Sequence, residues 1–142
     1  MFRLTNPSCP PLITVVNTPA GLWRAAHPIS TPDAERATAF LASEPELYLA
    51  DLVVAETVDV LESFYKAPRE QVAEAMRSLA AMRSMITIDP SLLLRAIEVY
   101  EIDRLDFAEA YLVACAESTG IGRIASFDRT IDRVSIVERI EP

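Results

Sequence analysis

Three acidic residues, Asp106, Glu109 and Asp128, have the type and spacing to take part in phosphodiester chemistry. Asp106 and Glu109 stand at the predicted start of a helix, and Asp128 follows a short predicted strand, Ile124 to Phe127. In a parallel α/β sheet, strand C-termini and helix N-termini share one edge, so these carboxylates are expected to converge although about twenty residues separate them. Converging carboxylates need a counter-charge, and a divalent metal ion is the usual one.

Such a cluster suits metal-dependent hydrolysis. Carboxylates hold one or two ions, which lower the pKa of an attacking water and neutralise charge on the phosphate and the leaving oxygen. Two carboxylates a few ångströms apart repel by roughly 4 kcal/mol at an effective dielectric of 20, so the cluster is costly without cations. Glu56, near the start of an earlier predicted helix, is a fourth acidic candidate.

The same residues also have a purely structural interpretation. Asp106-x-x-Glu109 has the form of a capping box, which needs no metal. Asp128 before Arg129 suits a turn, and Glu56 suits an exposed helix face. Spacing alone leaves the catalytic and the structural interpretations open.

Composition sets the class of protein. The 142 residues fit one domain, and 51% hydrophobic residues argue against disorder. No apolar run is long enough for a membrane span, and no secretory signal is apparent. Cys9 and Cys115 have no metal-like spacing, which predicts a cytoplasmic protein. The net charge of −8 opposes nonspecific nucleic-acid binding by the whole surface, but not a local basic rim.

Arginines supply nearly all the positive charge, since Lys66 is the only lysine. Four of them fall in or beside the acidic stretch: Arg104, Arg123, Arg129 and Arg133. Each one alone suits a solvated surface, but the group near carboxylates points to a phosphate-bearing substrate. Other chemistries have little support, because the chain has a single histidine, His27, and no glycine-rich phosphate loop.

The pattern predicts a loose lead over 1–11 and a single domain over 12–142, with helices alternating with short apolar strands. The predicted strands are 12–16, 47–50, 124–127 and 135–140, with a possible extended segment at 85–88. The predicted helices are 31–43, 52–65 capped by Asp51, and three more opening at Pro68, Asp89 and Asp106. The expected fold is therefore α/β with a parallel sheet.

Three motifs resemble the PIN domain, in particular the VapC-type toxins of bacterial toxin–antitoxin pairs. They are Leu52-Val-Val-Ala-Glu56, Leu105-Asp-Phe-Ala-Glu-Ala-Tyr-Leu-Val-Ala and Ile124-Ala-Ser-Phe-Asp128-Arg. The resemblance runs from Ile13 to the end of the chain and implies a three-layer α/β fold, a short central parallel sheet flanked by helices. It also implies an endoribonuclease that depends on Mg²⁺ or Mn²⁺, a VapB-type antitoxin as partner and a homodimer.

The resemblance assigns site residues by position. The second, third and fourth acidic positions of the family fall on Glu56, Glu109 and Asp128, with Asp106 preceding the third. Thr18 and Ser126 fall on supporting positions. The implied catalytic residues are Glu56, Asp106, Glu109 and Asp128; the implied metal ligands are Asn17, Glu56, Glu109 and Asp128. The four arginines would meet the RNA.

Two positions depart from the family pattern. Family members end the first strand with Asp-Thr-Asn or Asp-Thr-Ser, whereas this chain has Asn17-Thr18-Pro19, and Glu109 replaces the usual aspartate. Asparagine offers a neutral oxygen, so metal affinity and activity are expected to be weakened. The alternative is a catalytically inactive PIN-fold binding module that retains the dimer and antitoxin surfaces. A phosphatase of the haloacid dehalogenase type needs an aspartate nucleophile at this position, and Asn17 argues against it.

Overall fold

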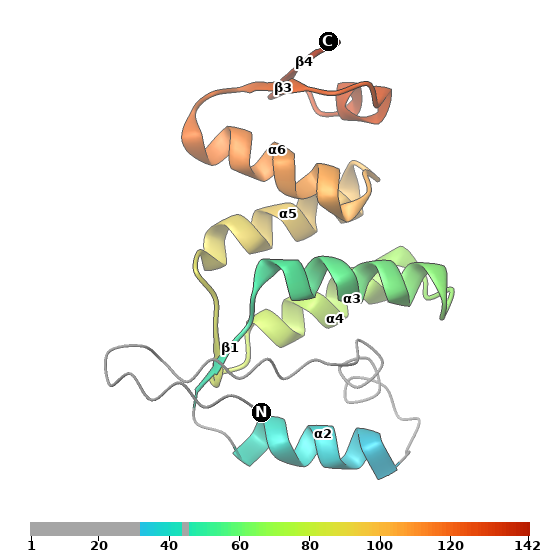
Figure 1. The fold of residues 1–142 in the computed structure, drawn as a ribbon, viewed down its shortest axis with the longest axis vertical. Helices are drawn as coiled ribbons and strands as arrows, with labels where there is room; N and C mark the ends of the chain where they lie inside the picture. Colours follow the sequence, from blue (N-terminus) through green and yellow to red (C-terminus); the bar gives the residue numbers. More distant parts are fainter. Residues whose placement is uncertain (1–31, 44–45) are drawn as a thin grey trace. The chain divides into compact units, whose positions relative to one another are not determined.

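A computed structural model of the chain describes residues 32–43 and 46–142, which form two compact units that divide between Ile88 and Asp89 (Figure 1). In the described residues, each unit combines helices with a pair of short parallel strands. This confirms the predicted α/β fold class. The predicted lead over 1–11, the strand over 12–16, and Asn17 and Thr18 lie outside the described residues.

In the first unit, the described residues form three helices and two strands. They are α2 (Pro32–Ser43), β1 (Leu47–Tyr48), α3 (Asp51–Ser63), α4 (Arg69–Ala80) and β2 (Met85–Ile86). The two strands pair in parallel, with Leu47 opposite Met85 and Tyr48 opposite Ile86. The pairing extends past β1, because the Leu49 N–H donates to the Ile86 carbonyl at 2.9 Å. The predicted strand over 47–50 is therefore confirmed in place but is only two residues long.

Helix α3 buries one apolar stripe, which includes Val54, Val58 and Leu61. The prediction that Asp51 caps this helix is wrong. Ala50 occupies the cap position without a side-chain bond, and Asp51 is the first helical residue. A carboxylate there still suits the positive end of the helix dipole. The helix also ends at Ser63 rather than at the predicted Tyr65, which is partly exposed.

The second unit contains two α-helices, a 3-10 helix and two strands. They are α5 (Pro90–Ile102), α6 (Phe107–Thr119), β3 (Arg123–Ala125), η1 (Arg129–Arg133) and β4 (Glu138–Ile140). Asp89 caps α5 as predicted, since its carboxylate accepts from the Leu92 N–H at 3.0 Å and proline follows at the first helical position. Gly120 ends α6 in a left-handed conformation, with φ of 69°.

Helices α5 and α6 pack against each other and form the core of this unit. Tyr100 of α5 meets Phe107 of α6 edge-to-face, with ring centroids 6.0 Å apart, and both side chains are buried. Arg95 of α5 adds a two-pronged ion pair to Glu117 of α6, at 2.7 and 2.8 Å. The guanidinium also reaches Glu98, one turn along α5, at 2.8 Å. Packing and charge thus join the two helices.

Strands β3 and β4 lie in parallel register, with Ile124 opposite Arg139, so both strands run toward η1 and its neighbouring loop. The predicted strands over 124–127 and 135–140 are confirmed in place but are three residues each. The 3-10 helix η1 was not predicted. Its Ile131 is fully buried and anchors the segment between the strands. Within the described ranges, no helix is long and apolar enough to cross a membrane.

The Arg95–Glu117 pair predicts a measurable loss of stability when it is broken. Glu117→Gln removes a carboxylate whose side chain is only 15% exposed, and we expect unfolding free energy to fall by about 1 kcal/mol at pH 7. The bond to Arg95 lowers the pKa of Glu117, so this stabilisation is lost as pH falls through that lowered pKa. Urea unfolding at several pH values measures both effects.

Glu98→Gln is the matched control, because it breaks the exposed ion pair within α5 and leaves the contact between helices. We expect it to cost about 0.5 kcal/mol or less. If Glu117→Gln and Glu98→Gln lower the free energy of unfolding equally, the ion pair between α5 and α6 stabilises the protein no more than the exposed pair within α5.

Candidate active site

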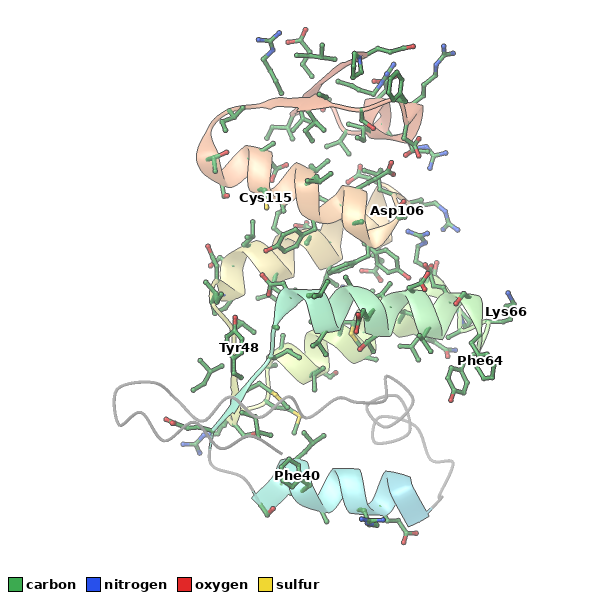
Figure 2. All side chains as sticks on the ribbon, viewed as in Figure 1. Phe40, Tyr48, Phe64, Lys66, Asp106 and Cys115 are labelled. Atoms are coloured by element: carbon green, nitrogen blue, oxygen red, sulfur yellow. The ribbon has the colours of Figure 1, made fainter. Side chains whose placement is uncertain are left out.

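Asp106 prepares the start of helix α6. Its backbone is extended, and its carboxylate accepts a hydrogen bond from the Glu109 N–H at 2.8 Å. Figure 2 marks Asp106 at this end of the helix. The cap satisfies one of the free N–H groups of the first turn and fixes the direction in which Glu109 leaves the helix.

Glu109 is the partly buried member of the cluster. Its Oε2 accepts a hydrogen bond from the Thr130 hydroxyl at 2.7 Å, which joins helix α6 to η1. The capping box suggested by the sequence thus has its aspartate half in place, while the glutamate side chain is directed to η1. The carboxylate of Glu109 therefore serves a tertiary contact rather than only a local one.

Asp128 lies in the loop after β3 and caps η1. Its Oδ1 accepts from the Thr130 N–H at 2.8 Å, and its own N–H donates to the Ser126 hydroxyl at 3.0 Å. Both bonds span two residues, the pattern of local turns built by Ser and Asp side chains. They hold the Asp128 carboxylate, which is exposed, at the end of the strand.

The three carboxylates interact electrostatically. The pKa of Glu109 is raised, first by burial and further by Asp128 and Asp106, while the Thr130 hydroxyl opposes the rise. The pKa of Asp128 is lowered, first by the backbone N–H of Thr130, then by the Thr130 side chain and by a hydrogen bond with Glu109, with smaller help from the Arg133 charge. The ionised form of Glu109 is therefore destabilised, whereas the ionised form of Asp128 is stabilised.

Two of the candidate arginines lie beside this cluster. Arg133 donates from Nη1 to the Arg104 carbonyl at 3.0 Å, which links the loop before α6 to the end of η1. Arg104 adopts a left-handed backbone, with φ of 58°, at this contact. Arg129 is exposed at the start of η1. Arg123 lies at the other end of β3 from Asp128 and pairs with Glu138 at 3.6 Å.

Arg139 supports the loop that carries Ser126 and Asp128. It donates to the Ser126 carbonyl and to Asp132 in η1, both at 3.0 Å, and its side chain is only 11% exposed. Sequence reasoning did not identify Arg139 or Thr130. The Asp128-x-Thr130 spacing was a usable signal, because aspartate commonly bonds the N–H two residues ahead. The Arg139 contact has no such local signal.

The remaining predicted residues are placed differently. Glu56 is exposed on helix α3 in the first unit, and Asn17 and Thr18 lie outside the described residues. Within 32–43 and 46–142, no group of three or more His, Cys, Asp or Glu side chains is arranged to hold a metal ion. The second unit thus presents a carboxylate pair, Glu109 and Asp128, with Asp106 close enough to raise the pKa of Glu109.

This pair has the chemistry that a hard divalent cation requires. Both residues offer carboxylate oxygens, the ligands that Mg²⁺ and Mn²⁺ prefer. Burial and neighbouring negative charge raise the pKa of Glu109, so a nearby cation would favour its ionised form. Glu109 and Asp128 therefore fit one part of a divalent-cation site.

The electrostatics predict that Glu109→Gln stabilises the metal-free protein near neutral pH. Because the folded-state pKa of Glu109 is raised above its usual value of 4.5, ionising it as pH rises costs stability. The amide removes this cost and keeps an oxygen for the Thr130 hydroxyl. We expect a gain on the order of 0.5 kcal/mol at pH 7.5 that disappears toward pH 4, measured by urea unfolding in EDTA.

Glu117→Gln on the same helix is the control of opposite sign, because the pKa of Glu117 is lowered rather than raised. It should lose stability at pH 7.5 under the same conditions. A loss of stability in Glu109→Gln as well would contradict the electrostatic account of Glu109.

Comparison with known proteins supplies the family. The model of the PIN domain matches residues 22–137, a range that spans both compact units and includes Glu56, Asp106, Glu109 and Asp128. No curated protein and no solved structure gives a significant match. The matched range covers most of the chain and contains the carboxylate pair described above. The chain therefore belongs to the PIN domain family.

Proposed function

We propose that this protein is a VapC-like endoribonuclease, the toxin of a toxin–antitoxin pair, that hydrolyses RNA phosphodiesters with Mg²⁺ or Mn²⁺. Membership of the PIN family indicates a nuclease-type function. The observation that carries the proposal is the Glu109–Asp128 pair, held at a strand end and a helix start by Thr130. Such a pair suits metal-assisted hydrolysis better than any other chemistry in the described part of the chain.

The proposed ligands are Glu109 and Asp128, joined by Glu56 and by the Asn17 amide oxygen through the family pattern. A bound divalent ion supplies charge neutralisation on the phosphate and a lowered pKa for an attacking water. Asp106 sets the first turn of α6, so it orients Glu109 through the backbone. Thr18 and Ser126 are the proposed supporting residues; the Ser126 hydroxyl accepts from the Asp128 N–H.

The arginines beside the pair are the proposed RNA contacts. Arg104 and Arg133 are tied together next to Asp128, and Arg129 is exposed on the same segment. Guanidinium groups bind phosphate oxygens in a two-pronged manner, which would position the RNA backbone at the carboxylates. Arg123 is a weaker candidate, because Glu138 already shares its charge.

The weak point of the proposed site is Asn17, and restoring the family residue tests it. Asn17→Asp adds a charged oxygen ligand, so we expect metal-dependent cleavage of RNA to rise by at least about tenfold, the smallest cost usually attached to disturbing a metal site. Cleavage of a fluorescent RNA in Mn²⁺, Mg²⁺ and EDTA measures this. Asp128→Asn in the Asn17→Asp background is the control and should abolish the gain. If Asn17→Asp gains no activity and binds no Mn²⁺, the metal-site assignment is wrong.

The second candidate function is a PIN-fold binding module without catalysis. It is favoured by the helix-capping roles of Asp106 and Asp128, because one oxygen of each carboxylate already accepts a backbone N–H bond that needs no ion. In this case the protein would keep a homodimer surface and a surface for a VapB-type antitoxin. Both proposed functions place the protein in the cytoplasm.

A Mn²⁺ soak of the crystallised protein separates the two candidates. The nuclease predicts anomalous density at the carboxylates of Glu109 and Asp128. The binding module predicts no density there and unchanged capping bonds at Asp106 and Asp128. Density elsewhere on the surface only would count against the nuclease.

A further inference from the structure

Within the described ranges, Thr130 donates hydrogen bonds to both members of the carboxylate pair. Its hydroxyl donates to Glu109 Oε2 at 2.7 Å, and its backbone N–H donates to Asp128 Oδ1 at 2.8 Å. Each bond takes up one oxygen of one carboxylate. The two carboxylates also interact with each other, since each one shifts the pKa of the other. Thr130 thus fixes two carboxylates that come from distant parts of the sequence.

A neutral donor has an advantage at this position. Two carboxylates repel, and a glutamate side chain has three rotatable bonds along which it can swing away. An arginine or lysine would hold the pair together, but its charge would repel an incoming cation. A hydroxyl and an N–H hold the carboxylates by hydrogen bonds and leave their negative charge available.

The segment around Thr130 is itself held firmly. Ile131, the next residue, is fully buried, and Asp132 is bonded to Arg139 at 3.0 Å. Thr130 is β-branched, which restricts its side chain to few rotamers. Its own side chain is partly buried. The hydroxyl therefore has a defined direction toward Glu109.

We propose that Thr130 is a positioning residue that sets the Glu109 and Asp128 carboxylates at the spacing a divalent cation needs. This inference rests on the proposed function, since it gives Thr130 a purpose in the same site. Thr130 acts through the two carboxylates and contacts neither ion nor RNA. Its hydroxyl donates to Glu109 and its side chain also lowers the pKa of Asp128, while its backbone N–H bond to Asp128 does not depend on the side chain.

The test removes the hydroxyl and keeps the shape. Thr130→Val has the same branching and retains the N–H bond to Asp128, whereas Thr130→Ser keeps the hydroxyl. We expect the Kd for Mn²⁺, measured by electron paramagnetic resonance, to rise about tenfold in Thr130→Val and to stay within about twofold in Thr130→Ser. In RNA cleavage, Thr130→Val should lower kcat and leave KM nearly unchanged, because the arginines are untouched.

Thr119→Val is the matched control, the same substitution on helix α6 at a hydroxyl that donates to the Cys115 carbonyl at 2.8 Å. Its Kd for Mn²⁺ should equal that of the wild type. Circular dichroism establishes that each variant is folded, and Thr130→Ala, which adds no methyl group next to the carboxylate, replaces Thr130→Val if the latter does not fold.

The outcomes separate this inference from the proposed function. Wild-type Kd for Mn²⁺ in a folded variant without the hydroxyl overturns the positioning role, while metal-dependent cleavage by the wild type leaves the nuclease in place. A complete lack of Mn²⁺ binding by both the wild type and Asn17→Asp overturns the proposed function, and the positioning role falls with it. Weaker Mn²⁺ binding in Thr130→Val, together with near-wild-type binding in Thr130→Ser, supports both the positioning role of Thr130 and the proposed function.

Discussion

The candidate site depends on one constraint: two carboxylates that repel each other must stay together. Glu109 and Asp128 meet this constraint through Thr130, which donates one hydrogen bond to each. Burial and, to a smaller extent, the neighbouring negative charge raise the pKa of Glu109. A charge arrangement of this kind serves no evident purpose in packing, because an uncharged side chain would meet the same Thr130 hydroxyl without repulsion. Under the proposed function this arrangement has a purpose, because a divalent cation would neutralise the two carboxylates.

The rest of the second unit supplies the rigidity that this arrangement requires. The contact between Tyr100 and Phe107 and the buried face of α6 fix the helix from which Glu109 extends. On the other side, parallel pairing of β3 with β4 and the bonds made by Arg139 fix the loop that carries Asp128. The acidic residues themselves add to this frame, since Asp106 and Asp128 cap a helix each. Structural and functional interpretations of these residues are therefore compatible.

Much of the fold could be predicted because its signals are local. Asp89 followed by proline, Asp106 three residues before Glu109, and Gly120 after an apolar run each specify a helix end through bonds within a few residues. The predictions failed at Asp51 and at η1, where a neighbouring part of the structure overrode the preference of the local sequence. Asp51 has the right type for a cap, but the chain enters α3 one residue earlier, and η1 forms because Ile131 is drawn into the core.

The sequence by itself determined most of the helix starts, the short apolar strands over 47–50, 124–127 and 135–140, the acidic residues near element ends and the family pattern that relates Glu56, Glu109 and Asp128. These are properties of residue type and of spacing along one chain. Only the tertiary structure decided that Thr130 bonds both Glu109 and Asp128 and that Arg139 holds the loop that carries Asp128. The physical reason is that such contacts join side chains across loops and helices, where direction and distance depend on packing. No periodicity in the sequence encodes them.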